Sequence, residues 1–495
     1  MSLVPLGMSV LCSCGGKRTC RGSSLRRVTA PLLLASNRGP VMHVEDETGA
    51  LVSRRGGGGL VSAVAGASLA GDALWVCAAL SEADRRAARS AERGLVAPGV
   101  RMLDLDPVTF DRAYNGVANS TLWFVNHLLY DTASSPVFDA RSRREWRAYQ
   151  EYDDAFAEAL ARAALPGATV LVQDYHLMLT PRQLRERRPD VRIGHFSHTP
   201  WAPPEYFSLL PDDVAREVLL GMLGADAVGF HSTRWADAFA RCCVEVLGAA
   251  YDGQVVSYAG RRTRVSTHPL GVDPVELRER AAAPDVQGRL PGLRDLVGDR
   301  QLLLRIDRTE LSKNIVRGLE AYRELLRGWP QWRERVVHLA FAYPSRHDLP
   351  EYREYTGAVQ RVAREVNEEF ATEGWLPVHL EVRDDYARSL AAFSLADVLL
   401  VNPLRDGMNL VAKEGPVLSE HGLSLVLSRQ AGAADELAPW AHLVNPFDVA
   451  QTAEALHAAL SESTSSRVER TASLAAAATA LPPADWLAAQ LAALP

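Results

Sequence analysis

Short apolar segments alternate with longer amphipathic segments along the chain from Pro31 onward. The apolar segments have the length of buried strands, and the amphipathic ones carry apolar residues at helical spacing. In the first half the predicted strands are Leu32–Ala35, Trp75–Ala79, Val170–Gln173, Arg192–Ser197, Ala227–Phe230 and Val265–Leu270, with helices at Arg143–Ala164 and Arg234–Leu247. This alternation predicts a parallel sheet covered by helices.

The same alternation starts again in the second half of the chain. There the predicted strands are Gln301–Ile306, Val336–Phe341, Val378–Val382, Val398–Val401, Leu423–Leu427 and His442–Val444, with helices at Asn314–Leu326 and Tyr352–Ala371. Residues 275–300 interrupt the pattern with Pro284, Pro291 and many charges. We therefore predict an α/β protein of two doubly wound, Rossmann-like domains that face each other across a cleft.

Four segments of the chain follow from these patterns. We expect residues 1–28 to be a disordered extension, because they are rich in Gly, Ser, Cys and Arg. Residues 29–275 form the predicted N-terminal domain and residues 276–460 the C-terminal domain. Residues 461–495 are rich in Ala, and we expect a helical segment that packs back on the N-terminal domain.

Composition and charge exclude several classes of protein. The chain has 495 residues, of which 47% are hydrophobic, and a net charge of −6. This charge argues against a nucleic-acid-binding surface. Since no apolar stretch has the length that crosses a bilayer, we expect a soluble protein without a membrane partner.

The cysteines favour a reducing compartment. They stand at positions 12, 14, 20, 77, 242 and 243, which is not the pattern of a disulfide framework, so we expect a cytoplasmic protein. Cys12, Cys14 and Cys20 lack a fourth ligand at zinc-site spacing, and no other cluster has metal-site spacing. We therefore expect no metal site.

The stretch Pro403–Glu414 carries the densest candidate chemistry. It follows the apolar segment Asp397–Val401 and opens a predicted helix. An ordinary strand-to-helix turn would also contain an Asp-Gly pair. However, the amides of a helix N-terminus at a strand end can bind an anion or sugar hydroxyls, and Glu414 lies about one turn further on, within reach of a ribose.

Two polar segments lie near the start of the first predicted domain. Arg54–Leu60 contains four consecutive glycines, which permit close approach of a ligand to the backbone, although a surface loop explains them equally well. The segment does not match the dinucleotide motif, so we reject NAD binding. Ser36-Asn37-Arg38 ends the first strand.

Titratable side chains end two further strands. Asp174-Tyr175-His176 follows one of them, and His195 and His198 lie at the end of the next. A single histidine at a strand end is more often structural, but several at neighbouring ends can bind sugar hydroxyls.

Three cations follow strands of the second domain. They are Arg308, Lys313 and Arg346. Such cations are often solvated surface, but together beside a helix N-terminus they would form a diphosphate clamp.

In their order along the chain, these motifs resemble the trehalose-6-phosphate synthases, a retaining glycosyltransferase family with the GT-B fold. The resemblance covers residues 31 to 490 and depends on motifs spread over the chain: Ser36-Asn37-Arg38, Gly58–Leu60, Asp174–Leu177, His198-Thr199-Pro200, Ser312-Lys313, Ser345-Arg346, Pro403–Glu414 and Asn445–Asp448. It implies retaining transfer of glucose from a nucleotide-glucose to glucose 6-phosphate, forming α,α-trehalose 6-phosphate, without a cofactor.

The resemblance also implies roles for individual residues. The N-terminal domain would bind the acceptor through Arg38, Tyr114, Trp123, Asp174 and Arg346 of the other domain, and the donor would contact Gly58, Gly59, Arg308, Lys313, Asp406, Met408, Asn409, Leu410, Val411 and Glu414. The implied catalytic set is Arg308, Lys313, His198 and Asp406. Departure of a nucleotide diphosphate leaves negative charge that Arg308 and Lys313 can stabilise.

Two departures from the family pattern leave the donor open. Glu310–Asn314 stands where the family often has Asp-Tyr-Ser-Lys-Gly, and Gly229–Ser232 stands where it often has Gly-Phe-Gln-Thr. Both GDP-glucose and UDP-glucose therefore stay open, with a slight preference for GDP-glucose. A pseudo-glycosyltransferase with a cyclitol acceptor and a non-catalytic regulatory subunit are the alternative functions, and a homo-oligomer stays open.

Overall fold

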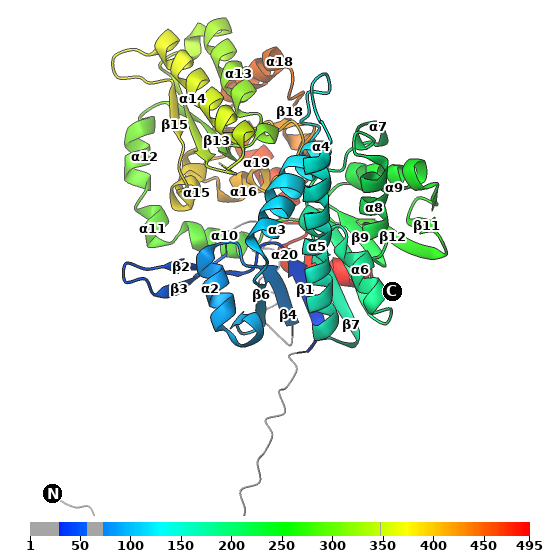
Figure 1. The fold of residues 1–495 in the computed structure, drawn as a ribbon. Helices are drawn as coiled ribbons and strands as arrows, with labels where there is room; N and C mark the ends of the chain where they lie inside the picture. Colours follow the sequence, from blue (N-terminus) through cyan, green and yellow to red (C-terminus); the bar gives the residue numbers. More distant parts are fainter. Residues whose placement is uncertain (1–28, 57–72, 347) are drawn as a thin grey trace, which may run out of the picture.

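The computed structural model describes residues 29–56, 73–346 and 348–495. Within them, two sheets with helices packed on their faces form two lobes that lie side by side (Figure 1). The proposed donor-loop residues Gly58 and Gly59 lie outside the described residues, as do Cys12, Cys14 and Cys20. The predicted α/β class with two doubly wound sheets is confirmed.

The first sheet belongs to the N-terminal half of the chain. Its strand order is β10-β11-β12-β9-β8-β7-β1-β4-β6-β5, parallel except at both edges. The strands are β1 (Ala30–Ser36), β4 (Ala73–Ala78), β5 (Leu95–Ala97), β6 (Val100–Leu103), β7 (Ala164–Gln173), β8 (Arg192–Ser197), β9 (Ala227–Phe230), β10 (Ala250–Tyr251), β11 (Val255–Tyr258) and β12 (Arg261–Thr267). A separate hairpin joins β2 (Val41–Glu45) to β3 (Leu51–Arg55).

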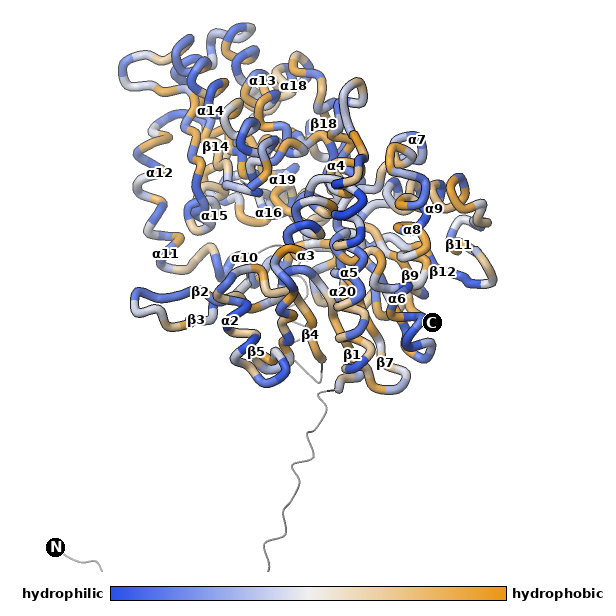
Figure 2. Tube along the Cα trace, in the orientation of Figure 1, coloured by the Kyte–Doolittle hydropathy of each residue, from blue (hydrophilic) through white to orange (hydrophobic). Residues whose placement is uncertain are grey.

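The second sheet is parallel throughout its described strands. Its order is β15-β14-β13-β16-β17-β18. The strands are β13 (Gln301–Arg308), β14 (Val336–Tyr343), β15 (Val378–Glu381), β16 (Val398–Val401), β17 (Ser424–Ser428) and β18 (His442–Val444). Parallel strands are buried on both faces, which is why the sequence shows them as continuous apolar runs. Figure 2 shows the hydrophobic colour on strands such as β4 and hydrophilic turns on the surrounding helices.

Helices cover both sheets. Those of the first half are α2 (Glu82–Ser90), α3 (Pro107–Asp111), the π-helix η2 (Arg112–Leu122), α4 (Trp123–His127), α5 (Ala140–Ala163), α6 (Thr180–Arg187), α7 (Pro204–Phe207), α8 (Asp212–Met222) and α9 (Thr233–Leu247). Those of the second half are α10 (Pro274–Ala281), α11 (Pro284–Gln287), α12 (Leu290–Val297), α13 (Ile315–Gly328), α14 (Pro350–Phe370), α15 (Tyr386–Leu395), α16 (Val411–Leu418), α17 (Ala434–Leu437), α18 (Val449–Ser461), α19 (Thr464–Ala478) and α20 (Pro483–Ala492).

The predicted interruption at residues 275–300 is wrong in one respect, because this stretch is mostly helical. It contains α10, α11 and α12. Pro284 and Pro291 both stand in the first turn of a helix, where the missing N–H has no intrahelical partner to lose. Proline at these positions starts a helix and does not break the pattern.

The last two helices pack against different sheets. Leu474 and Ala478 of α19 belong to the core of the second sheet. In α20, Trp486 and Leu487 pack with Phe196 of the first sheet. Figure 1 places α20, in red, against the strands of the first lobe. The domain limits given above stay a prediction.

Candidate functional site

The two sheets meet through the loops at the carboxyl ends of their strands. The Trp235 indole N–H donates to the Gly407 carbonyl at 3.1 Å, and Arg405 donates to the Trp201 carbonyl at 3.0 Å. Gly407 lies so close to the other domain that a Cβ atom there would stand 1.8 Å from the His198 carbonyl oxygen. This position therefore needs glycine.

The loop between β16 and α16 presents Asp406 and Asn409 at this junction. Asn409 has a φ of 81°, and its amide donates to Asp406 Oδ2 at 3.0 Å. Its own side-chain oxygen accepts from the Ala412 amide, in the first turn of α16, at 3.2 Å. Met408 is buried, and Leu410 and Val411 are half-buried on the same loop and first turn of α16.

Glu414 lies one turn further along α16, and burial raises the pKa of its carboxyl to about 7.

Lys313 is ion-paired with Asp406. The Lys313 ammonium lies 2.5 Å from Asp406 Oδ2. Burial opposes the charge of Lys313, but Asp406 and Asp307 outweigh it and raise the pKa of Lys313. The two charged groups hold each other in place at the end of the strands.

Arg308 is paired with Glu310. Their side chains are 3.0 Å apart, and Arg308 is 51% exposed whereas Glu310 is fully buried. Burial opposes the charge of Glu310, but Arg308, Arg346 and Lys313 outweigh burial and lower the pKa of Glu310 to about 2. Because Ser345 also donates to Glu310 at 2.8 Å, this carboxylate joins the loop after β13 to the loop after β14.

A buried arginine supports the loop that carries Lys313. Arg305 is fully buried on β13, forms an ion pair with Asp307 at 2.9 Å and donates to Asn402 Oδ1 at 2.6 Å. It also donates to the Lys313 carbonyl. Asn314 follows with a φ of 59° and donates to two further carbonyls, those of Asn402 and Pro446. This network holds the backbone from which the Lys313 side chain extends.

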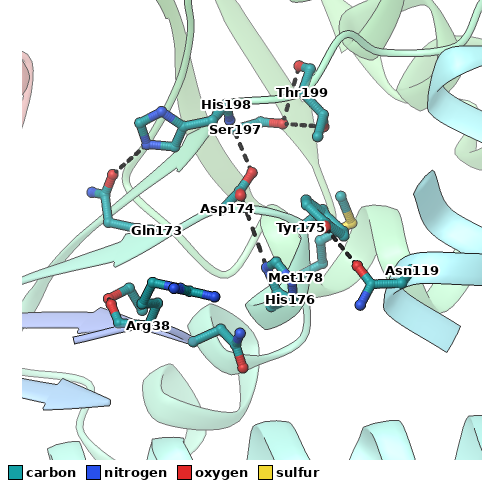
Figure 3. Close-up of polar contacts among 12 residues, drawn as sticks. Arg38, Asn119, Gln173, Asp174, Tyr175, His176, Met178, Ser197, His198 and Thr199 are labelled. Atoms are coloured by element: carbon teal, nitrogen blue, oxygen red, sulfur yellow. Dashed lines mark hydrogen bonds and ion pairs between the residues drawn. The ribbon is translucent and has the colours of Figure 1, made fainter. Parts of the chain in front are cut away.

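The predicted acceptor residues lie around Tyr175 and His176, which follow β7 of the first sheet. Tyr114 stacks on His176 with ring centroids 5.6 Å apart, and Trp123 lies 5.5 Å from the Tyr175 ring. The Arg346 guanidinium lies 3.9 Å from the centroid of the Trp123 ring. In Figure 3 the Arg38 side chain extends toward His176 and Asp174.

Two arginines therefore converge from opposite domains. Burial first, then the charges of Arg346 and Arg38, lower the pKa of His176 well below its usual value. A neutral histidine near both guanidinium groups leaves their positive charge available to an anion. Arg38 is exposed, and the Ser36 hydroxyl donates to its carbonyl at 2.7 Å, which orders the turn.

Asp174 is held in an uncommon conformation at the end of β7. Its φ is 74°, and the His198 amide donates to its Oδ1 at 3.1 Å (Figure 3). Burial raises the pKa of Asp174 to about 6, and amide hydrogen bonds only partly offset burial. Within the described chain, Asp174, Asn314, Arg346 and Asn409 are four of the eight non-glycine residues with positive φ. Such conformations concentrate at functional sites, so their gathering here supports the assignment of this region.

The His198 ring is engaged on both nitrogens. Its Nδ1 lies 3.1 Å from His231 Nε2, and its Nε2 lies 2.9 Å from the side-chain oxygen assigned to Gln173 (Figure 3). His231 Nδ1 faces the His268 carbonyl at 3.3 Å and must donate to it, so His231 Nε2 accepts from His198. His198 Nε2 then needs a donor, and the Gln173 amide nitrogen is buried without a partner among the described residues. The Gln173 amide is therefore better oriented the other way.

One sequence interpretation is wrong: His195 is not a strand-end ligand. It is 2% exposed within β8, where its ring contacts the Asp174 carbonyl at 3.3 Å. The predicted limits of β8 already enclose His195, but only the packing of the sheet shows that its side chain is buried there.

Several residues of the region were not assigned a role from the sequence. Tyr175, His127 and Arg305 contact predicted site residues directly, and Asn119 contacts Tyr175. Tyr175 stands inside a motif used above, whereas Asn119, His127 and Arg305 have no sequence feature that separates them from core residues.

Two absences concern the described residues alone. They contain no group of three or more His, Cys, Asp or Glu side chains placed to hold a metal ion. None of their helices combines the length and the apolar character that a membrane crossing requires.

Two Rossmann-like domains whose strand ends meet and carry cations and the Asp406 loop are the arrangement of the GT-B class of glycosyltransferase folds. The chain belongs to glycosyltransferase family 20, whose model matches residues 31–495.

Curated relatives agree with this membership. A bifunctional trehalose-6-phosphate synthase/phosphatase of Thermoproteus tenax is 36% identical over 393 residues, covering 79% of this chain and 52% of that protein. An α,α-trehalose-phosphate synthase (UDP-forming) of Aspergillus niger is 32% identical over 451 residues, covering 89% and 91%. The chain thus spans about half the length of the Thermoproteus tenax relative and 57% of a relative from Dictyostelium discoideum.

Solved structures of the same class superpose on this fold. An α,α-trehalose-phosphate synthase (UDP-forming) from Burkholderia vietnamiensis has a TM-score of 0.80 at 30% identity, covering 93% of this chain and 98% of that one. An E. coli trehalose-6-phosphate protein with bound UDP-2-fluoro glucose has a TM-score of 0.80 at 27% identity, with the same coverage of both chains.

Proposed function

We propose that this protein transfers glucose, with retention, from a nucleotide-glucose to glucose 6-phosphate and forms α,α-trehalose 6-phosphate. The observation that carries the proposal is the meeting of two sets of residues at one junction. Lys313, Arg308 and the Asp406 loop come from the second sheet, and Arg38 and Asp174 come from the first. Family membership supports the same reaction.

In the proposed reaction the bond between glucose C1 and the diphosphate oxygen breaks, and a bond from C1 to the anomeric oxygen of the acceptor forms on the same face. The proton of the acceptor hydroxyl passes to the departing phosphate oxygen. Lys313 and Arg308 stabilise the charge that develops on the diphosphate. Asp406 and the Asn409 side chain hold the donor glucose, and Glu414 holds the ribose.

The acceptor is held by its phosphate. Arg38 and Arg346 bind the phosphate. The sugar is contacted by three further residues: Tyr114, Trp123 and Asp174. Binding energy from the phosphate, which does not react, then orients the reacting hydroxyl. Because the His198 ring is occupied by His231 and Gln173, we propose that His198 acts on the donor sugar through its position and backbone.

We propose that no metal or other cofactor is required. Two side-chain cations at the leaving group supply the charge that a divalent ion supplies elsewhere. Activity should therefore persist in excess EDTA, and a loss restored by Mg²⁺ would contradict this part of the proposal.

The donor base is open to two candidates. The names of the relatives from Aspergillus niger and Burkholderia vietnamiensis favour UDP-glucose. The departures at Glu310–Asn314 keep GDP-glucose as the second candidate, since they lie beside the proposed diphosphate site.

Two other functions have less support. A non-catalytic regulatory subunit should lack part of the set Arg308, Lys313 and Asp406, and this chain keeps all three. A sugar-phosphate acceptor is favoured over the cyclitol acceptor of a pseudo-glycosyltransferase because the chain keeps the whole family set: Arg38, Tyr114, Trp123, Asp174, Asp406 and Asn409. Cytoplasmic location and a homo-oligomer stay predictions.

The deciding experiment incubates the purified protein with glucose 6-phosphate and, separately, UDP-, GDP- and ADP-glucose. Trehalose 6-phosphate and released nucleotide are measured. Product with at least one donor is the expected result, and comparison of kcat/KM among donors assigns the base. A folded protein that binds nucleotide and forms no trehalose 6-phosphate with any donor would contradict the proposal.

A further inference from the structure

We propose that Tyr175 positions the Arg346 guanidinium for the acceptor phosphate, and that Asn119 orients the Tyr175 hydroxyl for this task. The inference deepens the proposed function, because it assumes that Arg346 binds the phosphate of glucose 6-phosphate. It makes Tyr175 and Asn119 positioning residues that do not themselves touch the substrate.

Arg346 belongs to the second sheet but is held mainly by the first. It follows β14 with a φ of 49°, and its Nη2 donates to the Tyr175 hydroxyl at 3.0 Å. Its Nη1 donates to Tyr352 of its own domain at 2.6 Å. The guanidinium also stacks on Trp123 of the first domain. Of the hydrogen bonds described for the Arg346 side chain, the one to Tyr352 is the only one made within its own domain. The contacts to Tyr175 and Trp123 therefore restrict a side chain that would otherwise be flexible.

The Tyr175 hydroxyl can accept from Arg346 because its own proton is used elsewhere. It donates to the Asn119 side-chain oxygen at 2.9 Å. Arginine has donors only, so the hydroxyl must present a lone pair to it. Burial raises the pKa of Tyr175 well above its usual value, so the hydroxyl keeps the proton that this arrangement requires. Tyr175 is 2% exposed, which leaves water little access to either bond.

Asn119 lies on the π-helix η2. It is fully buried, and its amide nitrogen has no partner among the described residues. The Ser120 and Thr121 hydroxyls donate to the carbonyls five residues earlier, at 2.6 and 3.2 Å. These bonds support the wider turn of the π-helix. Single π-turns are frequent at functional sites. The longer π-helix η2 carries Tyr114 near its start, and Trp123 follows it directly as the first residue of α4, so this continuous helical stretch presents two proposed acceptor residues and Asn119.

Enough of the guanidinium stays available for a phosphate. Arginine has five N–H donors, and the bonds to Tyr175 and Tyr352 use two of them. Both hydroxyls are neutral acceptors, so they fix the group without cancelling its charge. The two bonds and the Trp123 stack restrict rotation of the side chain, which lowers the entropy lost when a phosphate binds.

The test is Tyr175→Phe, which removes the hydroxyl and keeps the ring. We expect the KM for glucose 6-phosphate to rise about tenfold, the low end of the value of a hydrogen bond to a charged group. The kcat and the donor KM should stay within about twofold of the parent, because the donor clamp is not touched. With unphosphorylated glucose as acceptor at high concentration, the rate of Tyr175→Phe should equal that of the parent, because glucose has no phosphate for Arg346 to bind.

Asn119→Ala is the second variant and should raise the same KM by a smaller factor, since Tyr175 stays but loses its orientation. Tyr322→Phe is the matched control. It removes another buried hydroxyl, which donates to the Val336 and Pro377 carbonyls at 3.2 and 3.3 Å in the second domain, and should leave both KM values unchanged. An equal rise in donor and acceptor KM for Tyr175→Phe would overturn the inference, as would a rise no larger than that of Tyr322→Phe.

Calorimetric titration separates this inference from the proposed function. If the parent forms no trehalose 6-phosphate but binds glucose 6-phosphate, and Tyr175→Phe weakens this binding about tenfold while leaving glucose binding unchanged, the inference stands and the reaction proposal fails. If Tyr175→Phe binds glucose 6-phosphate like the parent, the inference is overturned whatever the reaction. Should Tyr175→Phe fail to fold, Asn119→Ala decides by the same criteria.

Discussion

At the scale of single residues, burial sets the charge states of the site. Asp174 and Glu414 are carboxyl groups with raised pKa values of about 6 and 7, whereas Glu310 and Asp406 stay ionised because cations lie beside them. The contrast has one physical cause. Removing a carboxylate from water disfavours its charge unless a nearby positive group compensates.

Lys313 should contribute most of its effect at the chemical step. In Lys313→Ala, kcat should fall by about 10²–10³, comparable to loss of one preorganised charge-stabilising donor. Steady-state kinetics with the preferred donor measures this, and the thermal unfolding midpoint checks that the variant is folded. A kcat near that of the parent would show that the leaving group is stabilised by other residues.

Glu414 should make donor binding depend on pH near neutrality. As the pH falls through about 7, its carboxyl gains a proton and loses an acceptor for the ribose hydroxyls, so the donor KM should rise. In Glu414→Gln the donor KM should be uniformly higher and flat over this range. A parent profile that is flat between pH 6 and 8 would contradict the assignment.

The same group affects stability in the opposite direction. Its folded pKa lies above its unfolded value, so the favourable contribution is present at low pH and is lost as pH rises toward 7. The parent should therefore lose stability relative to Glu414→Gln between about pH 5 and pH 8. Chemical unfolding of both proteins at these two pH values measures the difference.

At the scale of elements, the loop from β13 to α13 is held by buried charge. Arg305 joins Asp307, Asn402 and the Lys313 carbonyl in one network. A loop carrying a cation toward a substrate needs such support, because the side chain can be no better placed than the backbone beneath it.

Replacement of Arg305 by Leu should destabilise the second domain by about 3–5 kcal/mol, because Asp307 keeps a buried charge without its partner. Urea unfolding measures the change. The control is Arg361→Ala, which removes an exposed arginine with a side-chain exposure of 61% and should change stability by less than about 0.5 kcal/mol. If both variants unfold alike, the buried network contributes little to the domain.

At the scale of the whole molecule, the connection between the domains is held by the last helices. The segment His268–Val272 leads from β12, the last strand of the first sheet, toward α10. The Gly271 and Val272 amides donate to the Leu481 and Ala478 carbonyls at 2.8 and 3.0 Å. Lys413, fully buried, donates to the Leu270 carbonyl at 2.8 Å and pairs with Glu436 at 2.5 Å. The end of the chain thus reinforces the place where the chain passes from one domain to the other.

Trp486 is the main apolar anchor of this arrangement. It is fully buried, its N–H donates to the His268 carbonyl at 3.0 Å, and its ring lies 4.9 Å from Phe196. Trp486→Ala should remove about 3–5 kcal/mol of stability and lower the midpoint of thermal unfolding by about 10 °C. Trp486→Phe keeps most of the packing and should lose much less, and equal losses in the two variants would contradict a packing role.

Much of the fold could be predicted because its information is local. Continuous apolar runs marked the buried strands, and β8 and β9 have the predicted limits. The order of motifs along the chain was enough to indicate the family. The starts of α11 and α12 were missed because both contain proline. Proline interrupts a helix when it stands in the middle, but it is well tolerated in the first turn.

What the sequence determined by itself is therefore the set of elements, the class of fold and the residue types available for chemistry. Only the tertiary structure decided which of them meet. Lys313 pairs with Asp406 across 93 positions, and Arg346 reaches Tyr175 across 171. Hydrophobic periodicity reports the burial of each segment separately, whereas such contacts depend on how two sheets and their loops pack together, and no local pattern records that packing.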